Sequence, residues 1–241
     1  MKTTQSPPMP DDEDLRKWNE YIYSKILNKF DNRSSLYKYF QDNVYRNISK
    51  LLGNKTNISV VDCGCGTGRL LNKSGYKFEK YYGFDVDNES INLAKQNHPN
   101  YNFQNKDITN LPLPTSTIDY FVSVYTLEHL FNLQAACYEM VRVLKPNGIL
   151  IAALPIEENI FINIIRKFTS CKVLKKEYDI DYSKIIYYEH CNYTKQILRT
   201  LSYFFDIEYI SYFPLKIPIL PINFNVTIKA KVKSFLKKEL R

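Results

Sequence analysis

A run of alternating glycines carries the clearest chemical signal in this sequence. Glycine occupies positions 64, 66 and 68 of the segment DCGCGTGRL, which begins at Asp62. Glycine adopts backbone angles that other residues avoid, and it lets the main chain approach a ligand without an intervening Cβ atom. A turn of this kind, followed by the free N–H groups at the start of a helix, is typical of nucleotide-binding loops. The segment therefore predicts a nucleotide site.

The residue after the last glycine discriminates between two kinds of nucleotide. A dinucleotide fingerprint that starts at Gly64 needs its third small residue at position 69, where this sequence has Arg69. Positions 85–87 contain no basic residue, which the 2′-phosphate of NADP would require. The observed spacing, GxGxG preceded by an acid, thus disfavours a dinucleotide.

Acidic residues recur at the ends of the first three predicted strands. Asp85 lies 23 residues after Asp62, close to the interval of about 20 that places a carboxylate on a ribose. Asp107 follows the third strand and can accept from an adenine amino group, while the amide of Ile108 can reach a ring nitrogen. Three acids at one edge of a sheet predict an adenosine site.

Strands and helices must alternate to bring these residues together, and the sequence pattern shows that they do. Short apolar strands are expected at 58–62, 81–85, 101–103, 119–125 and 149–154, and amphipathic helices at 69–73, 88–97 and 132–144. The last helix is stopped by the turn Lys145–Gly148. This alternation predicts an α/β fold with a parallel sheet covered by helices on both faces.

The flanking segments are predicted to complete one domain. A flexible polar tail (1–13) precedes a helical cap (14–52), which divides near 31–35 into two helices; the nucleotide-binding core spans 53–155. Residues 156–241 supply the substrate side, with helices at 157–167 and 194–204, strands at 207–213 and 224–228, and a proline-rich segment at 213–221. That segment is compatible with a lid or a subunit interface, which leaves the oligomeric state open.

Composition narrows the class of protein. The 241 residues carry a net charge of +8, and six of the bases lie in the last thirteen residues against Glu239 alone. We expect this basic tail to form a solvated helix face, although it can also attract nucleic acid. Five cysteines without CxxC spacing argue against disulfides and zinc, so no metal is expected. The apolar stretches are too short for a transmembrane helix and no signal peptide is visible, which predicts a cytoplasmic protein.

Four segments in order, VVDCGCGTGRLL, YYGFDVD, NKDITNLPLPTSTIDYFVSVYTLEHL and VRVLKPNGILIAALP, resemble the successive motifs of class I S-adenosylmethionine-dependent methyltransferases. The likeness is greatest to the small-molecule group that includes ubiquinone-biosynthesis enzymes, and it spans about residues 57–155. It implies a Rossmann-like, mostly parallel seven-stranded sheet whose last strand is antiparallel. It also implies S-adenosylmethionine as cofactor, with S-adenosylhomocysteine as product. The cofactor residues that it implies are Asp62, Gly64, Cys65, Gly66, Gly68 and Tyr125 around the methionine part, Asp85 and Val86 at the ribose and adenine, and Asp107 and Ile108 at the adenine edge.

Methyl transfer is an in-line displacement in which the cofactor supplies the hard chemistry, and a hydroxyl acceptor must also lose a proton. His190, in YYEHCNY, and His129, in TLEHL, are the candidate catalytic groups, whereas His98, before Pro99, is predicted to be a surface turn residue. We expect an O, N or C atom of a small molecule to be methylated. Tyrosines near the expected acceptor pocket suit an apolar or sugar-like compound, or they simply pack: Tyr178, Tyr182, Tyr187, Tyr188 and Tyr193.

Three other functions stay open from the sequence. A tRNA or other RNA methyltransferase would use the basic tail. An NAD-dependent oxidoreductase would share the fold and Asp85, but it would want a small residue in place of Arg69. A non-catalytic binding module would be free to lose the three acids, all of which are present.

Overall fold

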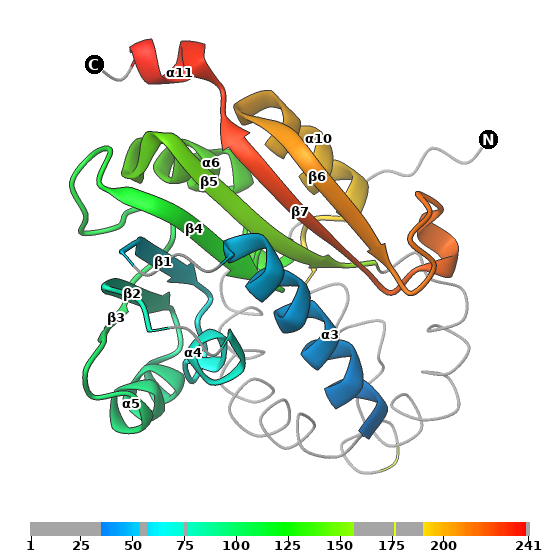
Figure 1. The fold of residues 1–241 in the computed structure, drawn as a ribbon, viewed down its shortest axis with the longest axis horizontal. Helices are drawn as coiled ribbons and strands as arrows, with labels where there is room; N and C mark the ends of the chain where they lie inside the picture. Colours follow the sequence, from blue (N-terminus) through cyan, green and yellow to red (C-terminus); the bar gives the residue numbers. More distant parts are fainter. Residues whose placement is uncertain (1–34, 54–56, 75–76, 157–175, 177–189, 240–241) are drawn as a thin grey trace.

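The computed structural model describes residues 35–53, 57–74, 77–156, 176 and 190–239. Within them, seven strands form one sheet in the order β3-β2-β1-β4-β5-β7-β6 (Figure 1). The strands are β1 (Ser59–Cys63), β2 (Lys80–Asp85), β3 (Asn102–Asn105), β4 (Ile118–Val124), β5 (Leu144–Pro155), β6 (Phe205–Phe213) and β7 (Asn225–Val232). The predicted Rossmann-like α/β fold is confirmed.

The sheet is parallel except at β7. Strand β7 lies between β5 and β6 and runs antiparallel to both, whereas β1, β2, β3, β4 and β5 pair in parallel. From β1 the chain moves outward to β2 and β3 and then returns to add β4 on the other side of β1. Doubly wound sheets bind ligands at the carboxyl ends of the strands beside such a reversal. The ends of β1 and β4 are therefore where a ligand site is expected.

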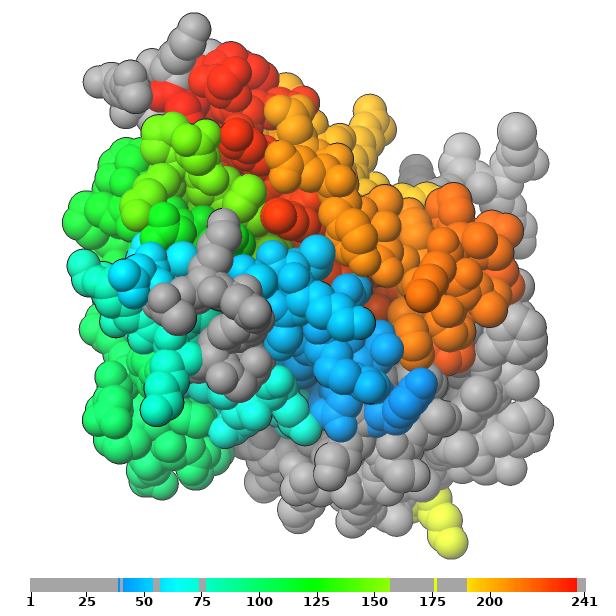
Figure 2. Space-filling model, in the orientation of Figure 1, coloured from blue at the N-terminus to red at the C-terminus, as the bar shows by residue number. Residues whose placement is uncertain are grey.

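Among the described residues, three helices cover one face of the sheet: α3 (Ser35–Leu52), α4 (Arg69–Ser74) and α5 (Asn88–Asn97). Ile48 of α3 and Leu70 of α4 are buried in the same apolar core as Val60 of β1 and Val122 of β4. In Figure 2, α3 crosses the visible face of the molecule between the residues of α4 and those of β6. This helix is the described part of the predicted N-terminal cap.

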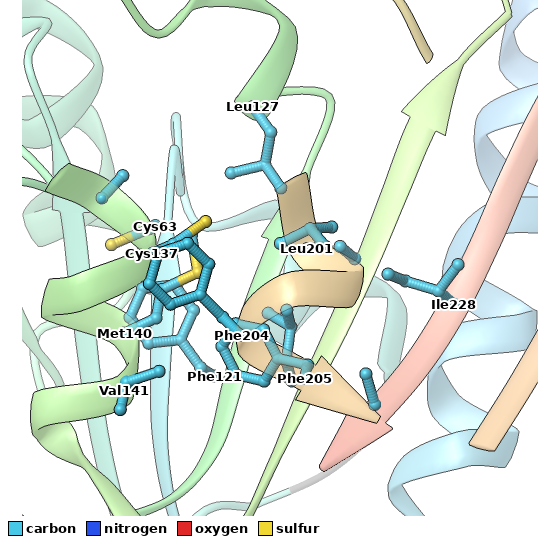
Figure 3. Close-up of a cluster of buried hydrophobic side chains, with 14 of the residues drawn as sticks. Cys63, Phe121, Leu127, Cys137, Met140, Val141, Leu201, Phe204, Phe205 and Ile228 are labelled. Atoms are coloured by element: carbon cyan, nitrogen blue, oxygen red, sulfur yellow. The ribbon is translucent and has the colours of Figure 1, made fainter. Parts of the chain in front are cut away.

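The opposite face carries α6 (Leu133–Val143), α10 (Thr194–Phe204) and α11 (Ser234–Glu239). Figure 3 shows Met140 of α6 and Phe204 of α10 in the same buried cluster as Phe121 of β4. Burial of these side chains removes apolar surface from water, which is the main force that holds helices on a sheet. Helices thus cover both faces, as the alternating pattern predicts.

Most predicted elements are found within one or two residues of their expected ends. Helices α5 and α10 have the predicted bounds. Strand β5 differs, because it begins at Leu144, before the predicted turn. Leu144 already pairs with Ile118, and the register then shifts so that Tyr120 pairs with Ile149. The turn residues therefore form an irregularity inside the strand rather than a separate loop.

The end of the sheet is longer than the sequence predicts. The last strand, expected at 224–228, continues to Val232. Between β6 and β7, buried Asn223 holds the proline-rich segment in place: its side-chain oxygen accepts from Leu215 N at 3.0 Å, and its amide donates to Ile217 O at 2.8 Å and to Ile219 O at 2.9 Å. A single buried side chain thus orders this segment from within.

The expectation that the basic tail forms a solvated helix face is wrong for part of that tail. Lys229 and Lys231 belong to β7 and are half-buried. Lys237 of α11 is buried, and its ammonium group donates to the carbonyls of Val141 and Leu144 at the end of α6. Because helices end with unpaired carbonyls, this lysine caps α6 from a distant part of the chain.

Several predictions fall outside the described residues. These are the tail at 1–13, the first helix of the cap, the helix at 157–167 and four of the tyrosines, Tyr178, Tyr182, Tyr187 and Tyr188. In the part of the chain that the structure describes, no helix has the length and apolarity needed to cross a membrane.

Candidate functional site

The three loop glycines all have positive φ angles: +72° at Gly64, +50° at Gly66 and +83° at Gly68. At Gly64 a side chain is also excluded by contact, since a Cβ atom there would lie 1.9 Å from Thr126 Oγ1. At Gly66 no atom of the described residues would lie within 4 Å of a Cβ atom. The loop therefore packs tightly on the end of β4 through Gly64, and no described residue fills the space beside Gly66.

Asp85, the last residue of β2, is tied directly to this loop. One carboxylate oxygen accepts from Gly66 N at 2.8 Å, and the other accepts from Asp87 N at 2.9 Å. Burial raises the pKa of this carboxyl above its ordinary value, while the two amides favour the ionised form and oppose that rise. The structure thus brings the predicted glycine loop together with Asp85, the residue predicted to bind the ribose.

Asp62 has a drier environment than Asp85. It is 3% exposed, and its carboxylate accepts from the hydroxyl of Tyr81 at 2.7 Å. Burial raises its pKa to about 7; the bond from Tyr81 lowers it, and the charge of Asp85 raises it further. Burial thus raises the pKa of both acids, and the hydrogen bonds that oppose the rise come from two backbone amides at Asp85 and from one hydroxyl at Asp62.

The predicted adenine-side residues follow β2 and β3. Val86 is 70% exposed, which is unusual for a valine and leaves an apolar surface at the strand end. Asp107 is exposed and uses one oxygen to accept from Thr109 N at 2.7 Å, while Ile108 is buried. Sequence reasoning missed Asn105, whose amide donates to the Val86 carbonyl at 2.7 Å and so links the two strand ends.

Tyr125 follows β4 at the same edge of the sheet. Its φ of +54° is uncommon for a bulky residue and marks a constrained turn. The turn is held because Tyr125 N donates to Ala153 O at 2.9 Å. Thr126 comes next and donates its hydroxyl to Cys63 O and Val124 O, both at 3.2 Å. The end of β4 is therefore fixed against the glycine loop.

The two candidate catalytic histidines lie against each other. The rings of His129 and His190 meet edge to face, with their centroids 4.9 Å apart. His129 belongs to the short 3-10 helix η2 (Leu127–His129), and its Nε2 lies 3.8 Å from the carboxylate of Glu128, which is 2% exposed. The fold thus joins two segments that are far apart in sequence. His98, by contrast, lies at the end of α5.

Asn192, which sequence reasoning missed, fixes this histidine pair. Its backbone N–H donates to Glu128 O at 3.0 Å, and its side-chain amide donates to Leu127 O at 3.2 Å and to Leu130 O at 2.6 Å. The side chain is buried and therefore well shielded from water. Asn192 locks η2 to the segment that carries His190.

Three buried cysteines of the described chain, Cys63, Cys65 and Cys137, are free thiols, and Cys191 is half-buried. Burial raises the pKa of Cys63 and of Cys65, with the nearby Asp62 and Asp85 charges adding to the rise, so neither is a nucleophile. Among the described residues, no group of three or more potential metal ligands comes together.

Comparison with known proteins finds methyltransferases among the relatives of this chain. A family model described as a methyltransferase domain matches residues 61–152, which run from β1 to β5. A protein of Methanocaldococcus jannaschii that is named as uncharacterized is 33% identical over 169 residues, which are 66% of this chain and 71% of that protein. The ubiquinone/menaquinone biosynthesis C-methyltransferase UbiE of Campylobacter jejuni is 32% identical over 104 residues, 40% of this chain and 44% of the enzyme. Residues 61–152 therefore match a methyltransferase domain, and the relatives with a named function, such as UbiE, are methyltransferases.

Solved methyltransferase structures share the fold. The magnesium protoporphyrin IX methyltransferase of Synechocystis PCC 6803 superposes with a TM-score of 0.65 and 14% identity, over 92% of this chain and 100% of that one. The alignments span 44% and 60% of the lengths of two Campylobacter methyltransferases named UbiE. The matched methyltransferase domain contains the glycine loop, Asp85, Asp107 and His129, whereas His190 and Asn192 follow it. The match of residues 61–152 to a methyltransferase domain disfavours the oxidoreductase alternative.

Proposed function

We propose that this chain binds S-adenosylmethionine and transfers its methyl group to an O, N or C atom of a small molecule. The observation that carries the proposal is the glycine loop itself, closed on β4 by Thr126 and bound to Asp85 through the amide of Gly66. This arrangement lies at the reversal of strand order, where the fold binds ligands. The names of relatives such as UbiE support the same reaction class.

The residues present fit this cofactor. No described residue fills the space beside Gly66, Asp85 is fixed in place to accept from ribose hydroxyls, and exposed Val86 offers an apolar surface to adenine. The proposed cofactor residues are Asp62, Gly64, Cys65, Gly66, Gly68, Tyr125, Asp85, Val86, Asp107 and Ile108. When bound, S-adenosylmethionine supplies an activated methyl group and a leaving group that becomes neutral.

In this proposal the protein mainly orients the cofactor and the acceptor and shields them from water. Hydrogen bonds hold Tyr125 and Thr126 at the end of β4, which fixes the backbone beside the proposed cofactor site. Holding reactants in a productive geometry can supply about 7–11 kcal/mol of the barrier. His190 is the proposed group that takes a proton from the acceptor or orients it, with His129 in contact with its ring.

Ligand binding tests the cofactor. Isothermal titration of the full chain with S-adenosylmethionine, S-adenosylhomocysteine and NAD should show binding of the first two and none of the third. Binding of NAD without S-adenosylmethionine would overturn the proposal. With binding established, a screen of candidate small-molecule acceptors and of RNA with methyl-labelled cofactor identifies the class that is methylated. Transfer of the label to RNA, and to none of the small molecules, would overturn the small-molecule assignment.

Substitution of the histidines tests their role. If His190 takes a proton, His190→Ala should lower kcat by about 100-fold or more while leaving cofactor affinity unchanged. His129→Ala should lower kcat less, because its proposed role is to support His190. His98→Ala is not a suitable control, since its ring contacts the glycine loop; exposed Lys95→Ala on α5 serves instead. Full turnover by His190→Ala on the true acceptor would contradict the assignment.

The proposed compartment is the cytoplasm. Buried free thiols such as Cys63 and Cys137 persist under reducing conditions. Fractionation of cells that express the tagged chain checks this placement.

A further inference from the structure

The ring of His98 lies against the glycine loop. A Cβ atom at Gly68 would come within 2.7 Å of His98 Cδ2 and 3.1 Å of His98 Nε2. The ring therefore fills the space that a side chain at position 68 would need. This corrects the expectation that His98 is a surface turn residue, because that expectation considered its neighbours in sequence and not those in space.

Contacts with α5 and with the residues before and within β3 also fix the position of His98. Its N–H donates to Ala94 O at 2.9 Å as the last turn of α5 closes, and its carbonyl accepts from Tyr101 N at 3.1 Å. The buried ring of Phe103 lies beside it, with the ring centroids 6.2 Å apart. The end of α5 and the start of β3 thus fix the ring on both sides.

Gly83 of β2 makes room for Phe103 in the way that Gly68 makes room for His98. A Cβ atom at Gly83 would lie 2.4 Å from Phe103 and 3.0 Å from Cys65 Sγ. Two adjacent rings, His98 and Phe103, therefore pack where two glycines leave room, one in the loop and one in β2. His98 Nε2 is buried and has no hydrogen-bond partner among the described residues, so packing and not hydrogen bonding accounts for its position.

We propose that His98 is a positioning residue for the cofactor loop: its ring holds Gly68 in the left-handed conformation that shapes the loop for S-adenosylmethionine. The inference rests on the proposed function for the identity of the ligand. His98 does not touch the reacting atoms in this proposal, and it acts through the backbone of Gly68. Its substitution should therefore change cofactor affinity and leave the chemical step unchanged.

His98→Ala tests the contact by removing the ring. We expect the Kd for S-adenosylmethionine to rise about fivefold and its KM to rise in parallel, with kcat unchanged, because only binding loses its pre-organised loop. His98→Phe keeps a ring of similar size without the nitrogen atoms and should bind within about twofold of the wild type. A fall in kcat without a change in Kd, for His98→Ala, would overturn the proposal.

A double-mutant cycle isolates the pair. Gly68→Ala should weaken binding strongly, since the new methyl group meets the ring and the residue keeps φ at +83°. Adding His98→Ala to that variant should restore part of the affinity. The matched control is Gly66→Ala, which carries similar backbone strain with no atom of the described residues within 4 Å of its Cβ, so its effect should add to that of His98→Ala without coupling.

The outcomes are distinct. Additive effects of Gly68→Ala and His98→Ala in binding titrations would overturn the positioning role. Thermal melts of each variant, with and without cofactor, separate a loop effect from a loss of folding, because a loop effect lowers the shift caused by cofactor more than it lowers the melting temperature of the free protein. A wild-type chain that binds no S-adenosylmethionine would instead refute the proposed function.

Discussion

Asp62 and Asp85 lie at the same edge of the sheet but meet different surroundings. Asp85 accepts from two backbone amides, whereas Asp62 is buried beside the hydroxyl of Tyr81. Amides favour a carboxylate, and a dry environment favours a neutral acid. The two amides thus support the ionised form of Asp85 against its burial, while Asp62, whose pKa burial raises to about 7, ionises near neutral pH.

This difference predicts pH-dependent cofactor binding. The folded pKa of Asp62, about 7, lies above its ordinary value of 3.8. Its carboxyl is therefore protonated below pH 7 and ionised above it, and a positively charged ligand favours the ionised form. We expect S-adenosylmethionine to bind about tenfold more tightly at pH 8 than at pH 6, as measured by titration calorimetry.

Two variants check the origin of that dependence. Asp62→Asn removes the titrating group and should flatten the pH profile. Tyr81→Phe removes the hydroxyl that lowers the Asp62 pKa, so the midpoint should move to higher pH. An unchanged profile in both variants would assign the dependence to another group.

The same shift predicts how stability varies with pH in the free protein. Because the folded-state pKa is raised, the folded chain keeps a proton between about pH 4 and 7 that the unfolded chain releases. The contribution of Asp62 is fully present below pH 4 and is lost as the pH rises through 7. Denaturation in urea at pH 5 and pH 8 should show a smaller difference in Asp62→Asn than in the wild type.

At the scale of elements, the short helix η2 depends on one distant side chain. Asn192 donates to three carbonyls around η2 with its backbone and side-chain N–H groups. Asn192→Ala would leave the carbonyls of Leu127 and Leu130 without that donor. We expect a loss of about 1–3 kcal/mol in the free energy of unfolding.

Turnover distinguishes this role from general stabilisation. Asn192→Ala should also lower kcat, because His129 and His190 lose their fixed relation. The matched control is Asn223→Ala, another buried asparagine that donates to two carbonyls but lies in the segment between β6 and β7. Equal losses of kcat in the two variants, at equal loss of stability, would show that Asn192 has no special relation to the histidines.

Local sequence signals predict the elements well and their long-range contacts poorly. The helix at 88–97 is marked by Asp87 at its start, whose side chain accepts from Glu89 N and Ser90 N. The glycine loop and Asp85 are likewise set by local spacing. The contacts of His98 with Gly68 and of Asn192 with η2 join residues 30 and more apart, and neither residue type signals such a contact by itself.

At the scale of the whole molecule, part of the excess positive charge belongs to lysines that lie within the fold. Lys237 is buried under the end of α6, and burial lowers its pKa to about 8, with the charge of Arg142 adding to the effect. Lys229 and Lys231 lie in β7. These three lysines do not form a free basic arm, which weakens the sequence-based case for RNA binding through the tail.

Lys237 should matter for stability more than its neighbours do. Lys237→Met keeps the length of the side chain but removes the donor to Val141 O and Leu144 O, and it should cost about 2 kcal/mol in urea denaturation. Lys233→Met is the control, since its partner Asp206 is exposed and 3.9 Å away, and it should cost about 1 kcal/mol or less. Equal costs would refute the capping role.

The order of the strands in the sheet cannot be predicted from the sequence pattern of strands and helices alone. Alternating strands and helices predict a parallel sheet, and the resemblance to methyltransferases implies an antiparallel last strand. The position of β7 between β5 and β6 depends on pairing across more than seventy residues, as between Ile149 and Lys231. The identity of the methyl acceptor cannot be predicted from the fold, because the side chains that line an acceptor pocket vary independently of the fold.

The insertion of β7 between β5 and β6 has a consequence for aggregation. Strand β7 is the neighbour of β6 in the sheet and separates it from β5. A chain in which β7 has detached therefore exposes the backbone edges of both β5 and β6. Unpaired strand edges pair readily with other chains, so conditions that release β7 should promote association between copies of this chain.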